Sequence, residues 1–217
     1  LRSLVGSEMC IRDRGSSEPI SSAKVASELA EEIGYPVIIK AAAGGGGIGM
    51  QIVHEEHEFE GALKLCQGRA KSAFGDDRVF VEKYIEGAQH VEFQVLADGN
   101  KAIHFGERFC SIQRRHQKLI EEGPWLTDEK RAEIGALVCA GAESVGYKGL
   151  ATFEFLRDKN GEFYFLEVNP RVQVEHTVTE LITGYNLVEL GIRVAQGEPL
   201  PLSQDDIKIR GHAIQCR

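Results

Sequence analysis

The sequence predicts an α+β fold built from antiparallel sheets. Residues 90–110 have the pattern of two strands joined by a turn, with Asp98-Gly99-Asn100 at the tip. Residues 150–169 repeat this pattern around a two-residue Asn160-Gly161 turn. Segments with apolar residues at helical spacing separate these hairpins. Such a mixture of hairpins and helices is typical of α+β proteins.

The other elements follow in chain order. Residues 21–34 form a helix that begins at a serine cap and ends at Gly34, and residues 55–72 form a second helix. The buried faces of these two helices are expected to hold Val25, Leu29 and Ile33, and Phe59, Leu63 and Cys66. Further strands are expected over residues 35–43, 50–54, 78–85 and 212–216. Two more helices are expected, one over residues 127–146 with Thr127 as its N-cap, and one over residues 177–197 with a break near Gly184.

Composition limits the classes of protein that this chain can represent. It has 217 residues, 42% hydrophobic and 27% charged, which is typical of a globular protein with one or two domains. The net charge of -8 argues against a nucleic-acid surface, and no apolar run is long enough to span a membrane. Five scattered cysteines without a C-x-x-C pair favour a reducing compartment, so we expect a cytoplasmic protein without zinc or disulfides.

Both ends of the chain look incomplete. Residues 1–14 lack the continuous apolar segment of a signal peptide, and we expect them to be a non-native tail. The strand expected over residues 212–216 is cut off at Arg217. The chain therefore has the features of the central fragment of a longer protein.

The glycine-rich segment GGGGIG lies between two expected strands. Gly44, Gly46 and Gly49 satisfy G-x-G-x-x-G, but a strand rather than a helix follows, which argues against a dinucleotide-binding motif. The segment also lacks the Gly-Lys-Ser/Thr of a P-loop. Glycine backbones can close over phosphate oxygens, and Lys40 on the preceding strand offers a positive charge. We therefore favour a phosphate-binding lid over a merely flexible hairpin.

Two carboxylates face each other on the second hairpin. The Asn160-Gly161 turn places Glu154 opposite Glu167, and Asn169 continues the same face. Opposed carboxylates repel each other unless a cation lies between them, and Mg²⁺ prefers oxygen ligands. The hairpin therefore predicts a magnesium site.

The segment EVNPRVQVEH alternates polar residues with valine or proline over residues 167–176, which predicts one strand with a polar face. A solvent-exposed outer face is the alternative interpretation.

The segment RRHQK concentrates positive charge at Arg114, Arg115, His116 and Lys118 in an otherwise acidic chain, which would suit an anionic substrate, although a solvated face is the usual explanation for a charge run.

Taken together, these motifs closely resemble biotin carboxylase, the ATP-grasp component of acyl-CoA carboxylases and pyruvate carboxylase. The resemblance runs from about Ser21 to Arg217 and rests on EKYIE, QHVEFQVLADG, CSIQRRHQK, TFEFL, FLEVNPRVQVEH, TELITG and RGHAIQCR. It implies an incomplete ATP-grasp fold, with a lid subdomain over residues 15–84 and a core subdomain with Mg²⁺ and bicarbonate sites over residues 85–217.

The resemblance also implies roles for individual residues. The nucleotide-binding residues would be Lys40, Gly44, Gly45, Gly46 and Gly47 at the phosphates, Glu82, Lys83 and Ile85 at the adenine, and His90, Gln113 and His116 at the ribose and phosphates. Mg²⁺, or Mn²⁺ in its place, would be held by Glu154, Glu167 and Asn169. Bicarbonate would be held by Lys118, Arg171, Gln173 and Val174, with Glu175 as the base, and Arg217 would stabilise the biotin enolate.

The implied reaction has two steps: bicarbonate attacks the γ-phosphate of ATP to give carboxyphosphate, whose CO₂ is then captured by biotin. The implied partners are a second copy of the chain, a biotin carboxyl carrier protein or domain, and a carboxyltransferase subunit. One departure is Ile48, where many members of the family have arginine. Another ATP-grasp ligase of the carbamoyl phosphate synthetase type, and a nucleotide-binding module without turnover, remain as alternatives.

Overall fold

A computed structural model describes residues 15–43, 49–114 and 117–217, and its contacts divide the chain into two compact units. The first unit extends to Glu86, and the second runs from Gly87 to Arg217. The expected tail over residues 1–14, the glycines at 44–47 with Ile48, and Arg115 and His116 lie outside the described residues. No helix in the described part of the chain combines the length and the apolar character needed to cross a membrane.

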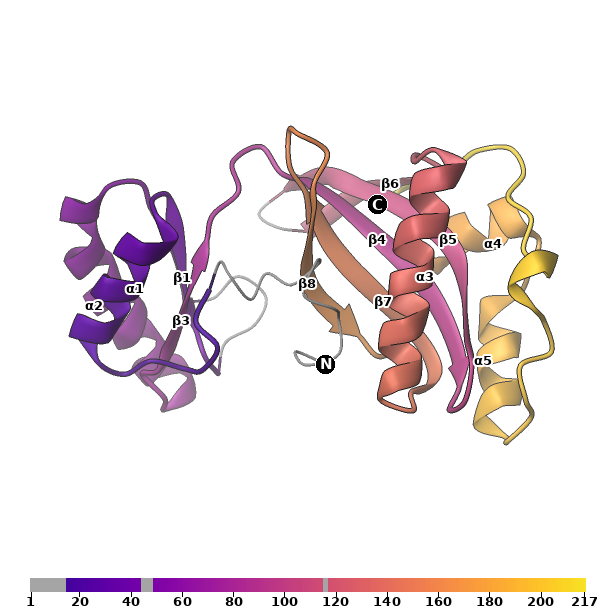
Figure 1. Ribbon diagram of the computed structural model, residues 1–217, viewed down its shortest axis with the longest axis horizontal. Helices are drawn as coiled ribbons and strands as arrows, with labels where there is room; N and C mark the ends of the chain where they lie inside the picture. The colour runs from indigo at the N-terminus through magenta and orange to yellow at the C-terminus, as the bar shows by residue number, and fades with distance from the viewer. Residues whose placement is uncertain (1–14, 44–48, 115–116) are drawn as a thin grey trace. The chain divides into compact units, whose positions relative to one another are not determined.

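The first unit is a three-stranded antiparallel sheet with two helices packed against it (Figure 1). The central strand β1 (Val37–Ala41) lies between β2 (Met50–Val53) and β3 (Val79–Lys83). The helices are α1 (Ala23–Ile33) and α2 (Glu56–Phe74). Burial of Phe59, Leu63 and Cys66 on α2 confirms the face predicted for that helix.

The predicted face of α1 is confirmed at Leu29 and Ile33, which pack against the core, and is wrong at Val25. Val25 is 49% exposed, whereas Ala26 and Ala30 are fully buried against the sheet. Small side chains let this helix pack closely, so alanine rather than valine marks the buried stripe. The helix ends at Gly34, as predicted, and this glycine has a φ of 76°.

The second unit is a six-stranded antiparallel sheet in the order β8-β7-β4-β5-β6-β9. Its first hairpin turns at Gly99 and Asn100, where the Asp98 amide donates to the Lys101 carbonyl, as predicted. The strands are β4 (Gln89–Asp98), β5 (Ala102–Arg114), β6 (Gln117–Gly123), β7 (Lys148–Arg157), β8 (Phe163–Asn169) and β9 (Ala213–Cys216).

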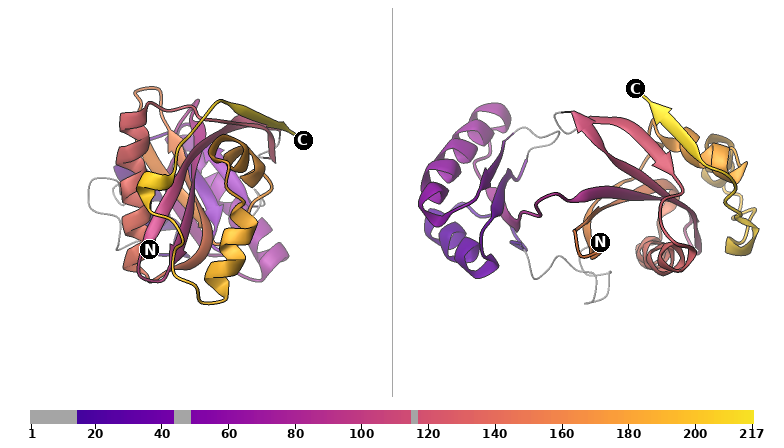
Figure 2. Two further views of the ribbon diagram at one scale, coloured as in Figure 1. Left: turned by 90° about the vertical axis from the view of Figure 1, so that its right-hand side faces the viewer. Right: turned by 90° about the horizontal axis from the view of Figure 1, so that it is seen from above.

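Helices cover both faces of this sheet. The helix α3 (Asp128–Ser144) packs on the side of β4 that carries Phe93, and α5 (Leu187–Ala195) packs on the side that carries Leu96 (Figure 2). The Thr127 cap is confirmed, because its hydroxyl accepts a 3.3 Å hydrogen bond from the Lys130 amide. The predicted break near Gly184 separates α5 from α4 (His176–Thr183), and a short 3₁₀ helix (Gln204–Asp206) precedes β9.

Two further expectations were wrong. The strand predicted through residue 176 ends at Asn169, because Pro170 has no backbone N–H and a turn follows in which the Arg171 amide donates to the Asn169 carbonyl. The two-residue Asn160-Gly161 turn is a longer loop, closed by the Asp158 amide donating to the Glu162 carbonyl at 2.9 Å. The strand β6 was not predicted.

Candidate active site

Charged side chains gather on one face of the six-stranded sheet, within the Gly87–Arg217 unit. They project from neighbouring strands on the face opposite α3, where Glu92 on β4 pairs with Glu154 on β7 and with Arg108 on β5. Because strand residues two apart share a face, the same side of β4 holds polar residues at one end and Leu96 at the other. The sheet therefore positions a polar cluster next to its own hydrophobic core.

Lys118 on β6 is the central cation of this cluster. Its ammonium group contacts the Glu92 carboxylate and donates hydrogen bonds to Glu175 at 2.8 Å and Glu154 at 3.1 Å. Only 12% of its side chain is exposed. Burial disfavours the charged form, but Glu92 and then Glu154 outweigh it, so the pKa of Lys118 lies above its ordinary value. One cation thus holds three carboxylates together.

Glu154 accepts several of the hydrogen bonds that build the site. Its Oε1 accepts from the side-chain amides of Asn169 and Gln173, both at 2.8 Å, and its Oε2 lies 2.7 Å from His90 Nε2. Burial raises its pKa, but the contacts with His90 and Lys118 dominate and lower the pKa to about 2. Glu154 is therefore an anion at neutral pH although only 4% of it is exposed.

Glu175, the residue before α4, lies between two cations. Its Oε1 accepts from Lys118 Nζ at 2.8 Å and its Oε2 accepts from Arg217 Nη2 at 2.6 Å. Arg217 Nη2 also lies 2.8 Å from the buried Glu121 Oε1. Burial opposes ionisation of Glu175, yet the hydrogen bond and charge of Lys118 lower its pKa. The Lys118 ammonium therefore stabilises the charged form of this buried carboxylate.

The predicted metal residues come together. Glu154 lies opposite Glu167, as predicted, and the Asn169 side-chain nitrogen bridges them at 2.8 Å and 3.2 Å. An amide group can turn its oxygen toward a cation in place of its nitrogen. Two carboxylates and one amide oxygen are the donors that Mg²⁺ accepts, so these residues fit that ion.

The residues expected at bicarbonate do not share one environment. Gln173 is 7% exposed and donates to Glu154, whereas Val174 is 59% exposed. Arg171 is exposed, and its guanidinium donates to the Asn169 side-chain oxygen and to the Val172 carbonyl, both at 3.3 Å. Arg171 therefore lies beside Asn169, one of the predicted metal residues, on an irregular segment and not on a strand.

The residues expected at the nucleotide fall in both units. In the first unit, Lys40 on β1 forms an ion pair with Glu82 on β3, and Lys83 donates to the carbonyl oxygens of Gly34 and Tyr35 at 2.8 Å and 2.9 Å. Ile85 follows β3 and is half-buried. In the second unit, His90 Nδ1 lies 2.9 Å from Gln113 Nε2. The four glycines and His116 lie outside the described residues.

Sequence reasoning missed three buried charges of the cluster, namely Glu92, Arg108 and Glu121, each 0% exposed. A signal was present in Glu92, which lies between the apolar Val91 and Phe93 on a long strand, whereas Arg108 follows another charged residue, Glu107. Their partners come from distant parts of the chain, however, so their pairing could not be predicted.

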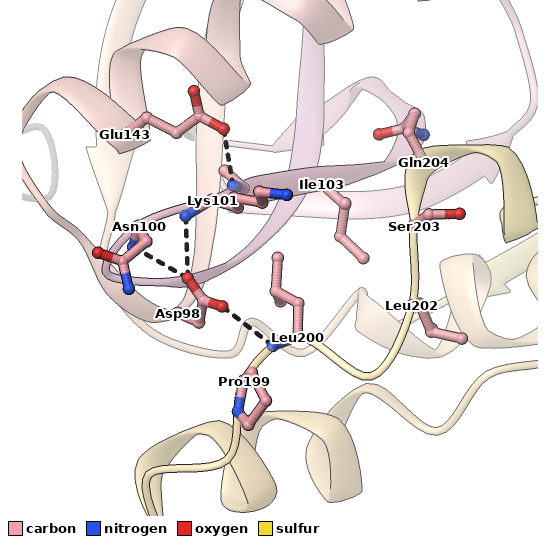
Figure 3. A pocket seen from close by; sticks show the side chains of 11 residues that line it. Asp98, Asn100, Lys101, Ile103, Glu143, Pro199, Leu200, Leu202, Ser203 and Gln204 are labelled. Atoms are coloured by element: carbon pink, nitrogen blue, oxygen red, sulfur yellow. Dashed lines mark hydrogen bonds between the residues drawn. The ribbon is translucent and has the colours of Figure 1, made fainter.

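A separate cavity of about 540 Å³ lies between the β4–β5 turn and residues 199–204 (Figure 3). Two of its carboxylates, Asp98 and Glu143, already accept hydrogen bonds within the protein. Asp98 accepts from the amides of Asn100, Lys101 and Leu200, and Glu143 accepts from the Ala102 amide. These contacts fasten the chain after α5 to the hairpin tip, which is a structural task.

Comparison with known proteins relates these features to a family. Residues 9–203 match the model of the carbamoyl-phosphate synthase L chain, ATP binding domain. The chain is 54% identical over 208 residues to a biotin carboxylase of Allochromatium vinosum, covering 94% of this chain and 46% of that protein. It is also 50% identical over 208 residues to a biotin carboxylase of Haemophilus influenzae, covering 94% and 46%. The chain thus spans about half the length of these curated relatives.

Solved structures agree with this relationship. The fold matches a biotin carboxylase–beta-gamma-ATP complex from Campylobacter jejuni with a TM-score of 0.92 and 47% identity, over 100% of this chain and 49% of that one. It also matches the biotin carboxylase domain dimer of Hydrogenobacter thermophilus 2-oxoglutarate carboxylase, crystallised with MgADP, ADP and bicarbonate, with a TM-score of 0.90 and 45% identity over 99% and 50%. The chain has the ATP-grasp fold and belongs to the family of the carbamoyl-phosphate synthase L chain ATP-binding domain, in which these relatives are biotin carboxylases.

Proposed function

We propose that this chain catalyses the ATP-dependent carboxylation of biotin by bicarbonate, the first half-reaction of a biotin-dependent carboxylase. The observation that carries the proposal is the buried Glu175 carboxylate, which accepts one hydrogen bond from Lys118 and another from Arg217. This arrangement places a proton acceptor between two cations that can hold an anionic substrate. The bicarbonate and MgADP in the complex of the Hydrogenobacter relative support this assignment.

The nucleotide and its metal ion would be held from several elements. We propose Lys40 and the backbone of residues 44–47 at the phosphates, Glu82, Lys83 and Ile85 at the adenine, and His90, Gln113 and His116 near the ribose. Glu154, Glu167 and Asn169 would hold the Mg²⁺ of MgATP. When bound, this ion neutralises negative charge on the phosphates during transfer.

Bicarbonate would lie against Lys118, Arg171, Gln173 and Val174, where Glu175 accepts its proton. The deprotonated oxygen attacks the γ-phosphorus of ATP, the bond to the bridging oxygen breaks, and carboxyphosphate and ADP result. Lys118 stabilises the negative charge that develops, because its ammonium is buried and already fixed by three carboxylates.

Carboxyphosphate then breaks down into CO₂ and phosphate, the released phosphate accepts the N–H proton of biotin, and the deprotonated nitrogen captures the CO₂. Arg217 would stabilise the enolate of biotin in this step. The biotin would be attached to a carrier protein or domain, and a carboxyltransferase would then use the carboxylated biotin. The assembled enzyme would be a homodimer in the cytoplasm.

The test is ADP formation from MgATP by this chain, measured with and without bicarbonate and free biotin. We expect turnover that requires bicarbonate and rises with biotin, and we expect Glu175→Gln to lower it by about a hundredfold or more through loss of the base. The control is Glu189→Gln, which removes an exposed carboxylate on α5. Equal turnover by Glu175→Gln and Glu189→Gln would contradict the assignment.

Two alternatives give different results in the same assay. A ligase of the carbamoyl phosphate synthetase type would form ADP with bicarbonate and respond to ammonia instead of biotin. A nucleotide-binding module without turnover would bind MgADP, detected as a raised melting temperature, and form no ADP under any condition.

A further inference from the structure

Arg108 on β5 is a fully buried cation that none of the proposed roles uses. Its side chain is 0% exposed, and all of its hydrogen bonds go to side chains on the polar face of the sheet or on α4. Its Nε donates to Glu92 Oε1 at 2.6 Å, and its Nη1 donates to Gln94 Oε1 at 2.9 Å. Its guanidinium also donates to Thr179 Oγ1 at 2.7 Å and, more weakly, to Thr152 Oγ1 at 3.5 Å.

One branch of this network leads to Lys118. Glu92 uses its Oε1 for Arg108 and its Oε2 for the Lys118 ammonium. Both oxygens of the carboxylate are therefore fixed, and its position determines where the ammonium lies. Arg108 also supplies Glu92 with a charged partner at a site where neither side chain is exposed.

The other branch leads to Glu175. Thr179 lies on α4, and Glu175 is the residue that directly precedes this helix. The two residues are four positions apart, so about one helical turn separates them. The hydrogen bond from Arg108 to Thr179 therefore fixes the first turn of α4 against the sheet, and the base is attached to that turn.

We propose that Arg108 is a positioning residue that holds Lys118 and Glu175 in register for bicarbonate activation. The inference rests on the proposed function, because Lys118 and Glu175 need a fixed relative position only if both act on the same bicarbonate. A buried guanidinium is costly, and apolar side chains fill such space at no greater cost in stability. A planar group with several donors can, in contrast, bond at the same time to a strand and to a helix.

The decisive variant is Thr179→Val, which keeps the shape of the side chain and leaves the Arg108–Glu92 pair in place. It removes the hydrogen bond to α4 alone. We expect the kcat of bicarbonate-dependent ADP formation to fall about tenfold because the base is displaced, with the KM for MgATP changed less than about twofold.

The matched control is Thr152→Val. Thr152 is equally buried, and within the described part of the chain its hydroxyl makes only the 3.5 Å contact with Arg108. It lies on β7 rather than on the helix attached to Glu175. We expect its kcat to stay within about twofold of the unchanged chain. Equal losses in the two variants, or no loss in either, would overturn the proposal, because a merely structural role predicts no difference between them.

A second measurement tests the connection independently of turnover. Amide hydrogen exchange of residues 173–183 should become faster in Thr179→Val and remain unchanged in Thr152→Val. Unchanged exchange in Thr179→Val would overturn the positioning role. If exchange is faster in Thr179→Val but the unchanged chain shows no bicarbonate-dependent turnover, the hydrogen bond from Arg108 still fixes α4. That result would count against the proposed function and not against the link between Arg108 and α4.

Discussion

His104 on β5 predicts a measurable dependence of stability on pH. The residue is 9% exposed, its ring meets Phe93 edge to face at 6.1 Å, and its Nδ1 accepts a hydrogen bond from the Gly106 amide at 3.3 Å. Burial lowers the pKa of His104 to about 4; Glu107 opposes this effect and Arg131 adds to it. Protonation at Nδ1 would also break the bond from Gly106.

The sign and magnitude follow from linkage. The unfolded chain has the ordinary histidine pKa of 6.5, so it binds a proton as the pH falls below this value while the folded chain does not. The stability that neutral His104 contributes is therefore complete above pH 6.5 and is lost as the pH falls to about 4. At about pH 5, some 1.5 units below the unfolded value, the loss is about 2 kcal/mol.

The assay can report on the relevant unit alone. The chain has one tryptophan, and Trp125 stacks on Phe109 at 4.6 Å within the Gly87–Arg217 unit. Urea unfolding followed by tryptophan fluorescence at about pH 7.5 and pH 5 gives the free energy of unfolding of that unit at each pH. Between these two pH values, the free energy of unfolding of His104→Gln should fall by about 2 kcal/mol less than that of the unchanged chain.

A control separates this effect from general destabilisation. Val138 on α3 is 2% exposed in the same core, so Val138→Ala should lower stability at both pH values by a similar amount and keep the pH dependence of the unchanged chain. If His104→Gln loses as much stability between the two pH values as the unchanged chain does, His104 is not held neutral by burial.

Three further changes have expected outcomes in the same unfolding assay. Arg131→Met should cost about 3–5 kcal/mol, because it leaves the fully buried Glu107 carboxylate without its 2.6 Å partner. Gly106→Ala should cost more than about 1 kcal/mol, since the glycine has a φ of 82° and a Cβ would lie 2.6 Å from Ile209 Cδ1. Hydrogen bonds from backbone amides lower the pKa of Asp98 from its ordinary value of 3.8 to about 2, so its carboxylate stabilises the fold above pH 3.8 and this stability is lost as the pH falls to about 2. Asp98→Asn should therefore lower the free energy of unfolding near neutral pH and make its decrease in acid smaller.

The sequence predicted the local structure well where periodicity determines it. The α+β class, both long hairpins, the Thr127 cap and the break near Gly184 are all confirmed. The strand β6 was missed because its residues, QKLIEEG, combine exposed and buried polar side chains without a regular alternation. Glu121 in this strand is buried because Arg217, far along the chain, lies beside it, and no local pattern contains that information.

The pairing of Glu154 with Glu167 was predicted from reasoning that was partly wrong. A two-residue turn at Asn160-Gly161 gives that register, but the loop is longer and places Arg157 opposite Phe163, one residue out of step. A bulge between Glu154 and Phe155 then restores the predicted pairing. The bulge re-aims Glu167 toward Glu154, and bulges often lie beside functional sites for this reason.

The segment EVNPRVQVEH keeps its alternation after its strand has ended, and this persistence distinguishes a site from an ordinary surface. On a solvent-exposed strand the valines would be buried and the polar side chains exposed. Here Val172 and Val174 are 42% and 59% exposed, while Gln173 and Glu175 are 7% and 2% exposed. Burying an amide and a carboxylate costs free energy unless each finds a partner. Gln173 donates to Glu154 at 2.8 Å and Glu175 accepts from Lys118 at 2.8 Å, so the cluster on the sheet, and not the hydrophobic effect, determines which side of this segment faces inward.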